Sequence, residues 1–293
     1  MKNFKKIVFL GIQYIDYLVY PSKKNANLMT SIPSTIVKRE GSVLGVAKSA
    51  KKYFPKNFLQ ALFVPIVGKD YKIDNINSNI SPIIINDENT SSAILINDIK
   101  YGKSASFVDF TLNYFENLSN LISDKILEIN SSERLIHILY ADNMKIDKRF
   151  ISQLNKSDEI SIDFCRSNAS VIFSDANLCT CLKKLINKAK YIFLSDHEDD
   201  KYHSFVLEYK KDDSIFIFHK PDLVKIYFQE EEFVIENQFF DKNLKSEVGL
   251  GDLFSFLFLS KIIFYKEVKL KNLQDVISDI QKEIWLILKN NIN

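Results

Sequence analysis

The chain has 293 residues, of which 46% are apolar, and this is enough to bury a large core. Its formal net charge of +2, with both signs interspersed, argues against a nucleic-acid partner bound through a basic surface. No uncharged apolar run approaches the ~20 residues that a membrane helix needs, and the three cysteines form no disulfide framework. We therefore expect a cytoplasmic protein that binds neither nucleic acid nor membrane.

Strands and helices alternate through the first half of the chain. Continuous apolar runs predict buried strands at Lys6–Ile12 and Leu59–Val67. Helical patterns occupy Val46–Phe54 and Leu112–Ile129. Shorter strands are predicted at Tyr17–Tyr20, Ser34–Lys38, Pro82–Ile85, Ala93–Ile96 and Ala105–Phe110.

The second half continues the alternation and then becomes helical. Core strands are predicted at Arg134–Tyr140, Glu159–Asp163 and Tyr191–Leu194, with helices near Asp147–Leu154 and over Leu178–Lys188. Hairpin-like strands follow at Ser204–Tyr209, Ser214–His219, Leu223–Phe228 and Phe233–Glu236. The apolar run Leu253–Tyr265 predicts a central helix, and apolar residues at helical spacing from Leu273 to Leu288 predict an amphipathic C-terminal helix.

This order of elements predicts an α/β fold with a doubly wound, largely parallel sheet covered by helices on both faces. No repeat or linker divides the chain, so we expect one domain over residues 1–293, with a small β lid drawn from about 17–38 and 82–110. In such sheets ligands bind beyond the carboxyl ends of the strands.

The stretch Gly249-Leu250-Gly251-Asp252 stands directly before the central helix. Unpaired amide groups at a helix N-terminus, together with the positive end of its dipole, form an anion site. A carboxylate in the first turn is then held beside the anion. This pattern suits phosphoryl transfer, in which amides stabilise the transferred group and the carboxylate takes a proton from the attacking hydroxyl. The alternative is a plain turn followed by an acidic first-turn residue.

Several motifs together resemble, in order, the ribokinase-like (PfkB-type) carbohydrate kinase family. They are Gly11 with Ile15-Asp16, Gly41-Ser42-Val43-Leu44-Gly45-Val46-Ala47, Val67-Gly68-Lys69-Asp70, Gly102-Lys103, Ser195-Asp196-His197-Glu198 and Ser246-Glu247-Val248-Gly249-Leu250-Gly251-Asp252. The chain has only seven glycines, and six stand where the family has glycine. Glycine is kept where the backbone turns sharply or approaches a ligand closely.

The resemblance implies an ATP-dependent kinase that phosphorylates a hydroxyl of a small sugar or sugar-like metabolite, with Mg²⁺ as a second cofactor. It assigns Asp252 as general base and the amides of Gly249, Leu250 and Gly251 as the anion hole. It assigns Asp16, Gly41, Ser42 and Gly45 to the acceptor site, and Ser195 and Glu198 to the nucleotide and metal, with Glu198 organising Mg²⁺. It also implies a homodimer formed through the lid.

Two alternatives stay open because residues depart from the family at ligand positions. Ser42 replaces a glycine, Gly45 and Ser195 replace asparagines, and Ser246-Glu247 replaces an Asp-Thr pair. These departures favour a ribokinase-like binding or regulatory protein with weakened catalysis. A nucleoside kinase of the same fold is the other alternative.

Overall fold

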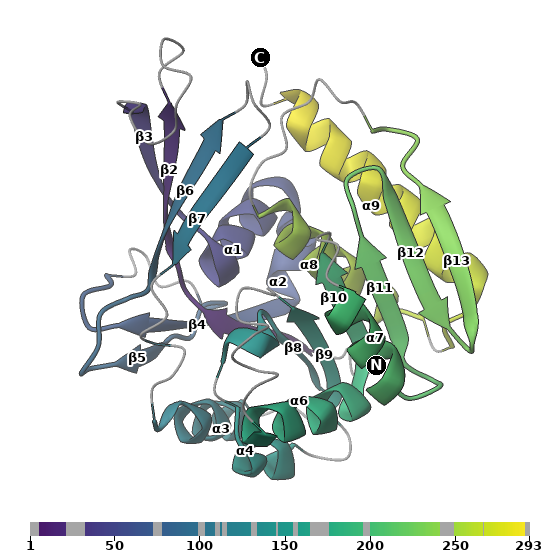
Figure 1. Cartoon of the computed structure of the whole chain (residues 1–293), viewed down its shortest axis with the longest axis horizontal. Helices are drawn as coiled ribbons and strands as arrows, with labels where there is room; N and C mark the ends of the chain where they lie inside the picture. Colours follow the sequence, from purple (N-terminus) through teal and green to yellow (C-terminus); the bar gives the residue numbers. More distant parts are fainter. Residues whose placement is uncertain are drawn as a thin grey trace.

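The structure is a computed structural model that describes residues 6–21, 33–72, 78–98, 103–108, 112, 116–129, 134–144, 146–154, 158–164, 176–195, 200–240, 249–265 and 267–290. A nine-stranded sheet forms its centre, in the order β13-β12-β11-β10-β9-β8-β1-β4-β5. The strands from β11 to β5 run parallel to their neighbours, and β12 and β13 are antiparallel. The predicted doubly wound α/β fold is therefore confirmed (Figure 1).

The strands of this sheet are β1 (Lys6–Ile12), β4 (Ala61–Gly68), β5 (Ile83–Ile85), β8 (Arg134–Ile138), β9 (Glu159–Phe164), β10 (Ala189–Ser195), β11 (Ile215–His219), β12 (Leu223–Phe228) and β13 (Glu231–Glu236). The helices are α1 (Ser42–Tyr53), α2 (Pro55–Leu59), α3 (Leu118–Glu128), α4 (Lys148–Gln153), α6 (Ala176–Lys188), α7 (Asp200–Tyr209), α8 (Leu250–Ile262) and α9 (Leu270–Asn290), with a short 3-10 turn at Ala141–Asn143.

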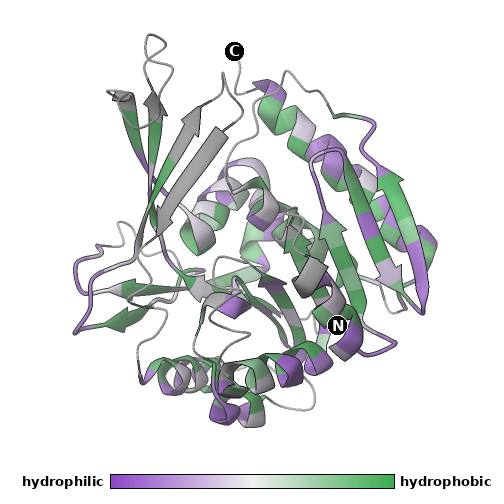
Figure 2. Ribbon diagram, in the orientation of Figure 1, coloured by the Kyte–Doolittle hydropathy of each residue, from purple (hydrophilic) through white to green (hydrophobic). Residues whose placement is uncertain are grey.

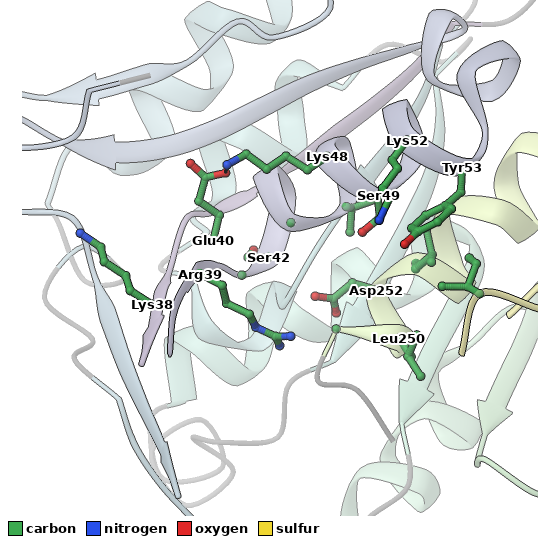
Figure 3. Close-up of a pocket in the computed structure, with 16 residues that line it drawn as sticks. Lys38, Arg39, Glu40, Ser42, Lys48, Ser49, Lys52, Tyr53, Leu250 and Asp252 are labelled. Atoms are coloured by element: carbon green, nitrogen blue, oxygen red, sulfur yellow. Dashed lines mark ion pairs between the residues drawn. The ribbon is translucent and has the colours of Figure 1, made fainter. Parts of the chain in front are cut away.

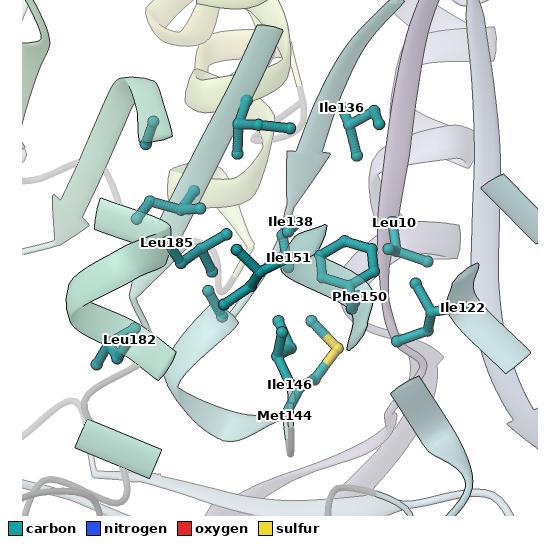
Figure 4. Packing of buried hydrophobic residues seen from close by; sticks show 14 of the residues in the cluster. Leu10, Ile122, Ile136, Ile138, Met144, Ile146, Phe150, Ile151, Leu182 and Leu185 are labelled. Carbon is teal, nitrogen blue, oxygen red and sulfur yellow. The ribbon is translucent and has the colours of Figure 1, made fainter. Parts of the chain in front are cut away.

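Alternating residues of the buried strands supply two hydrophobic cores, because successive side chains of a strand point to opposite faces. Ile7 and Phe9 pack with α1, α2, α8 and α9 on one face of the sheet. Val8 and Leu10 pack with α3, α4, α6 and α7 on the other face, part of which Figure 4 shows in close-up. The parallel strands at the centre of the sheet are mostly apolar in Figure 2, as expected where helices cover both faces, whereas β12 and β13 also contain charged residues.

A second, four-stranded sheet stands beside the first in the order β3-β2-β6-β7. It consists of β2 (Ile15–Pro21), β3 (Pro33–Glu40), β6 (Ser92–Asp98) and β7 (Lys103–Val108). It projects from one side of the molecule and flanks the N-terminal end of α1 (Figure 1). We call it the lid sheet. Because β3 leads directly into α1, the last residues of β3 lie next to the start of that helix.

Three sequence predictions are corrected. Ser204–Tyr209, expected as a strand, lies in α7, where Tyr202, Phe205 and Val206 are buried at helical spacing. Helix α3 begins at Leu118 rather than at Leu112. The strand expected at Pro82–Ile85, which falls within the range given for the lid, pairs in parallel with β4 at the edge of the central sheet.

None of the described helices combines the length and the apolar character needed to cross a bilayer. Helix α9 is long enough at 21 residues, but it is amphipathic and buries only one stripe, which includes Leu273, Val276, Ile277 and Ile280.

Candidate functional site

A cavity of about 430 Å³ opens where the lid sheet meets the first turns of α1 and α8. Figure 3 shows the side chains that β3, α1 and α8 contribute to its lining. The lining residues are Lys38, Arg39, Glu40, Gly41, Ser42, Gly45, Val46, Lys48, Ser49, Lys52, Tyr53, Gly249, Leu250, Asp252, Leu253 and Ile287. Six of the residues assigned to a site from the sequence, Gly41, Ser42, Gly45, Gly249, Leu250 and Asp252, therefore line one cavity.

The helix start at α8 has the geometry of an anion site. Gly249 is the N-cap residue, and its φ of 90° and ψ of 1° lie in the left-handed region that favours glycine. The first amide groups of α8 have no hydrogen-bond partner within the helix, as at the start of any helix. A Cβ on Gly251 would lie 3.1 Å from the ring of His219, so this turn also needs a small residue.

Asp252 sits in the first turn of α8 with its side chain buried. Burial raises the pKa of its carboxyl group to about 7, with a further upward contribution from the charge of Asp16. The hydrogen bond from Tyr140 and the charge of Arg39 act in the opposite direction and lower this pKa. A carboxyl group that titrates near neutral pH is suited to accept a proton in catalysis.

Tyr140 is the contact of Asp252 that sequence reasoning missed. Its hydroxyl donates to both carboxylate oxygens, at 2.8 Å to Oδ1 and 2.8 Å to Oδ2. The residue follows β8 at the carboxyl edge of the sheet, and its backbone is left-handed, with φ of 58° and ψ of 50°. Such a backbone costs a non-glycine residue about 1–2 kcal/mol, and residues held this way cluster at functional sites.

Asp16 is a second buried carboxylate, and its charge raises the pKa of Asp252. Its carboxylate is buried and forms an ion pair with Arg39, whose Nε is 3.5 Å from Oδ2. Burial raises the pKa of Asp16, and Arg39 offsets part of that rise. A Cβ on Gly41 would overlap the Asp16 carboxylate, so a larger residue at position 41 would require this ion-paired side chain to move. The packing of Gly41 against the Asp16 carboxylate thus accounts for one residue in each of two sequence motifs.

The turn between β3 and α1 is held by a buried glutamine that sequence reasoning also missed. Gln13 donates to the carbonyl oxygens of Tyr14 and Gly41, and its Oε1 accepts from the amide of Leu44. Ser42 keeps a left-handed backbone, with φ of 49°, where the resembling family has glycine, and its hydroxyl donates to the carbonyl oxygen of Ile12. The replacement of glycine by serine therefore preserves the turn.

The motif Val67-Gly68-Lys69-Asp70 has a structural role at the end of β4. The Gly68 amide donates to the hydroxyl of Thr90, and Asp70 accepts from the Thr90 amide. A Cβ on Gly68 would collide with the backbone at Asn89 and Thr90. This motif ties β4 to the segment that leads into the lid sheet.

Behind Asp252 lie further buried ionisable groups. Burial raises the pKa of Asp163 well above its usual value, and the charges of Asp252 and Asp142 raise it further. Asp142 accepts a hydrogen bond from Tyr202. His137, expected as a core residue, is fully buried with its Nδ1 2.9 Å from Ser161 Oγ, and burial lowers its pKa to about 3.

The two residues assigned to the nucleotide and metal are Ser195 and Glu198. Ser195 is the last residue of β10, in register with His219 of β11, and nothing is described of its side chain. Glu198 lies outside the described residues, as does Gly102. Among the described residues, no group of three or more His, Cys, Asp or Glu side chains could hold a metal ion. The roles of Ser195 and Glu198 stay predictions.

The fold was compared with known proteins. No family model and no curated protein matches the sequence. Among solved structures, the nucleoside kinase of Methanocaldococcus jannaschii, a ribokinase-family member, is similar over 96% of this chain and 89% of that one, at 16% identity and a TM-score of 0.60. The chain has the ribokinase fold.

Two other kinases have the same likeness. Ribokinase from Giardia lamblia is similar over 97% of this chain and 90% of that one, with 13% identity and a TM-score of 0.62. Phosphofructokinase-2 from Escherichia coli, in complex with fructose-6-phosphate, is similar over 98% and 99%, with 11% identity and a TM-score of 0.61. The fold expected from the motifs is thereby confirmed over nearly the whole chain.

Proposed function

We propose that this protein is an ATP-dependent kinase that phosphorylates a hydroxyl group of a small sugar-like molecule. The observation that carries the proposal is the position of Asp252, a buried carboxyl group in the first turn of α8, close to the left-handed Gly249 and lining the cavity. Its pKa of about 7 gives a base that is partly ionised at neutral pH and strong enough to accept a hydroxyl proton. The fold shared with sugar and nucleoside kinases supports the same reaction class.

In this proposal the chain supplies a base and a site for negative charge. Asp252 takes the proton from the acceptor hydroxyl as that oxygen attacks the phosphoryl group. The amides of Gly249, Leu250 and Gly251 stabilise the charge on the transferred group, since backbone donors fixed in place need no reorganisation during the reaction. The guanidinium of Arg39 lies near them, because a Cβ on Gly249 would be 4.0 Å from its terminal nitrogen.

The start of α8 is proposed to bind the phosphates of a nucleotide, because the open space at Gly249 allows close approach to the backbone amides. ATP would supply the phosphoryl group, and Mg²⁺ would neutralise charge on its phosphates, with Glu198 as the residue proposed to hold the ion through water. Asp16 is proposed to recognise acceptor hydroxyls. Its carboxylate is already paired with Arg39, so this role requires the acceptor to share or displace that ion pair.

The alternative is a binding or regulatory protein that kept the fold and lost efficient transfer. One observation favours it beyond the substitutions at Ser42, Gly45 and Ser195. The Tyr140 hydroxyl already contacts both oxygens of Asp252, where an acceptor hydroxyl must come to give up its proton. A carboxylate has about four sites for hydrogen bonds, so the kinase proposal requires the acceptor to bind Asp252 beside Tyr140, whereas the alternative makes no such demand. A nucleoside as the acceptor is the remaining variant of the kinase proposal, in line with the archaeal nucleoside kinase among the similar structures.

A direct assay separates the two classes. The protein is incubated with ATP, Mg²⁺ and panels of sugars, sugar derivatives and nucleosides, and phosphate transfer is followed by ³¹P nuclear magnetic resonance. The kinase proposal expects a new phosphate ester that depends on the acceptor. Ligands that raise the melting temperature, as those that bind only the native state do, yet give no ester with any nucleotide would replace it with the binding-protein alternative.

A further inference from the structure

The charge of the cavity carries information about the acceptor. Its lining includes four basic side chains, Lys38, Arg39, Lys48 and Lys52, and two acidic ones, Glu40 and Asp252. The N-terminal turns of α1 and α8 both open into it, and each adds the positive end of a helix dipole. Basic side chains therefore outnumber acidic ones in the lining.

The acidic groups are already engaged. Glu40 pairs with Lys48 through one carboxylate oxygen and accepts from the hydroxyl of Tyr71 through the other. Asp252 accepts from Tyr140, and Arg39 is paired with the buried Asp16. A neutral sugar is bound mainly by carboxylate and amide groups that accept from its hydroxyls. Glu40 has little capacity left for that purpose.

Lys48 and Arg39 are thus paired with carboxylates, whereas Lys38 and Lys52 differ from them. Within the part of the chain that the structure describes, neither Lys38 nor Lys52 has a carboxylate within 4 Å. Lys52 is held over the ring of Tyr53, with its Nζ 4.6 Å from the ring centre. Figure 3 shows its amine next to Ser49 on the cavity side of α1, whereas Lys38 points away from the other side chains.

Lys52 stands at the opposite end of the cavity from the start of α1. Gly45, Ser49 and Lys52 follow one another at helical spacing, so they share the face of α1 that lines the cavity. Seven residues of helix span about 10 Å. Asp252 and Lys52 both line this cavity, so one molecule bound in it can place a hydroxyl at Asp252 and another group at Lys52. A volume of about 430 Å³ suits a small ligand of that length.

We propose that the acceptor carries an anionic group, a phosphate or a carboxylate, at the end remote from the reacting hydroxyl, and that Lys52 binds this group. The inference rests on the proposed kinase function, because it takes the cavity as the acceptor site. It adds the substrate class, a sugar monophosphate or sugar acid in place of a neutral sugar. Ser49 is the neutral donor beside Lys52 for the same group.

Binding without nucleotide tests this inference separately from phosphoryl transfer. Calorimetric titrations compare ribose with ribose 5-phosphate, fructose with fructose 6-phosphate, and glucose with gluconate, at 50 mM and 300 mM salt. The expected result is at least about tenfold tighter binding of a charged member than of its parent, with the preference reduced at high salt because counterions screen exposed charge. The phosphate and carboxylate pairs identify which anion is preferred.

Lys52→Met is the informative variant, and Lys51→Met is its matched control. Both lysines lie in the last turn of α1 and both are exposed, but Lys51 does not line the cavity. Lys52→Met is expected to weaken the charged ligand about tenfold and to leave the parent sugar unchanged, while Lys51→Met changes neither. Equal effects of the two variants, or no preference for any charged member, including no binding at all, would overturn the proposal. Failure of transfer with preserved charge preference would instead count against the kinase function alone.

Discussion

The hydrogen bonds from Tyr140 to Asp252 make a sharp prediction about pH. Tyr140→Phe removes one hydroxyl and keeps the ring, so the perturbation is confined to the two 2.8 Å contacts with the carboxylate. That hydroxyl favours the ionised form of Asp252, whose pKa is about 7 in its presence. Its removal therefore raises the pKa of Asp252.

The size of the effect follows from the energy of the contact. A hydrogen bond to a charged group contributes about 1.5–3 kcal/mol, and 1.36 kcal/mol corresponds to one pKa unit. The acidic limb of the pH–rate profile should move upward by at least about one pH unit in Tyr140→Phe. Turnover at pH 6 should then fall about tenfold, while turnover at pH 9, where Asp252 is ionised in both proteins, should change little.

The assay is ATP turnover with the best acceptor, measured from pH 5 to pH 9.5. Tyr202→Phe is a matched control, because the Tyr202 hydroxyl donates to another buried carboxylate, that of Asp142, at 3.0 Å. This control should lose stability without moving the acidic limb. A limb that stays at the same pH in Tyr140→Phe, or moves equally in Tyr202→Phe, would refute the assignment of Tyr140 as a positioning residue for Asp252.

Three further predictions concern backbone and buried charge. Gly249→Ala should lower stability by about 1–2 kcal/mol in urea unfolding, because a φ of 90° is strained for any residue with a Cβ, even though the nearest described atom beyond its chain neighbours is 4.0 Å from that Cβ. An unchanged midpoint would contradict this strain. Ser42→Ala should destabilise more than Ser42→Gly, since both lose the bond to Ile12 and only glycine relieves the φ of 49°; the reverse order would show that the turn is unstrained. Asp252→Asn should raise the melting temperature relative to wild type, by a margin that grows from about pH 4 to pH 7 and then levels off. Folding raises the pKa of Asp252, so the wild-type protein loses stability as the pH rises through this window, whereas the neutral asparagine does not. A margin that shrinks as pH rises would invert the sign of that pKa change.

The sequence predicted those parts of the site that local residue order determines. Two glycines and an aspartate before an apolar helix place Gly249 and Asp252 at one helix start, whatever the rest of the chain does. Asp16 and Gly41 were assigned from the family resemblance, and their direct contact explains why both types stand there. The core strands were predictable because parallel strands covered on both faces are continuous apolar runs.

The rest depended on tertiary contacts that no local pattern carries. Tyr140 lies 112 positions from Asp252, and nothing in its neighbourhood distinguishes it from any aromatic residue at a strand end. Arg39 and Gln13 act through a turn that exists only when the lid sheet meets α1. The segment Ser204–Tyr209 was mistaken for a strand because six residues that include a Phe-Val pair are compatible with both the strand period and the helix period. Helix α7 begins earlier, at Asp200, and the prediction did not include its first residues.

The proposed role of Asp252 as the general base is tested most directly by one variant. Asp252→Asn keeps the shape of the side chain and an oxygen that can accept from Tyr140, and it removes the ability to take a proton. Turnover of ATP with the best acceptor should fall at least about a hundredfold, while the dissociation constant of that acceptor, measured by calorimetry, stays within about twofold of wild type. Turnover within about tenfold of wild type in Asp252→Asn would contradict the account.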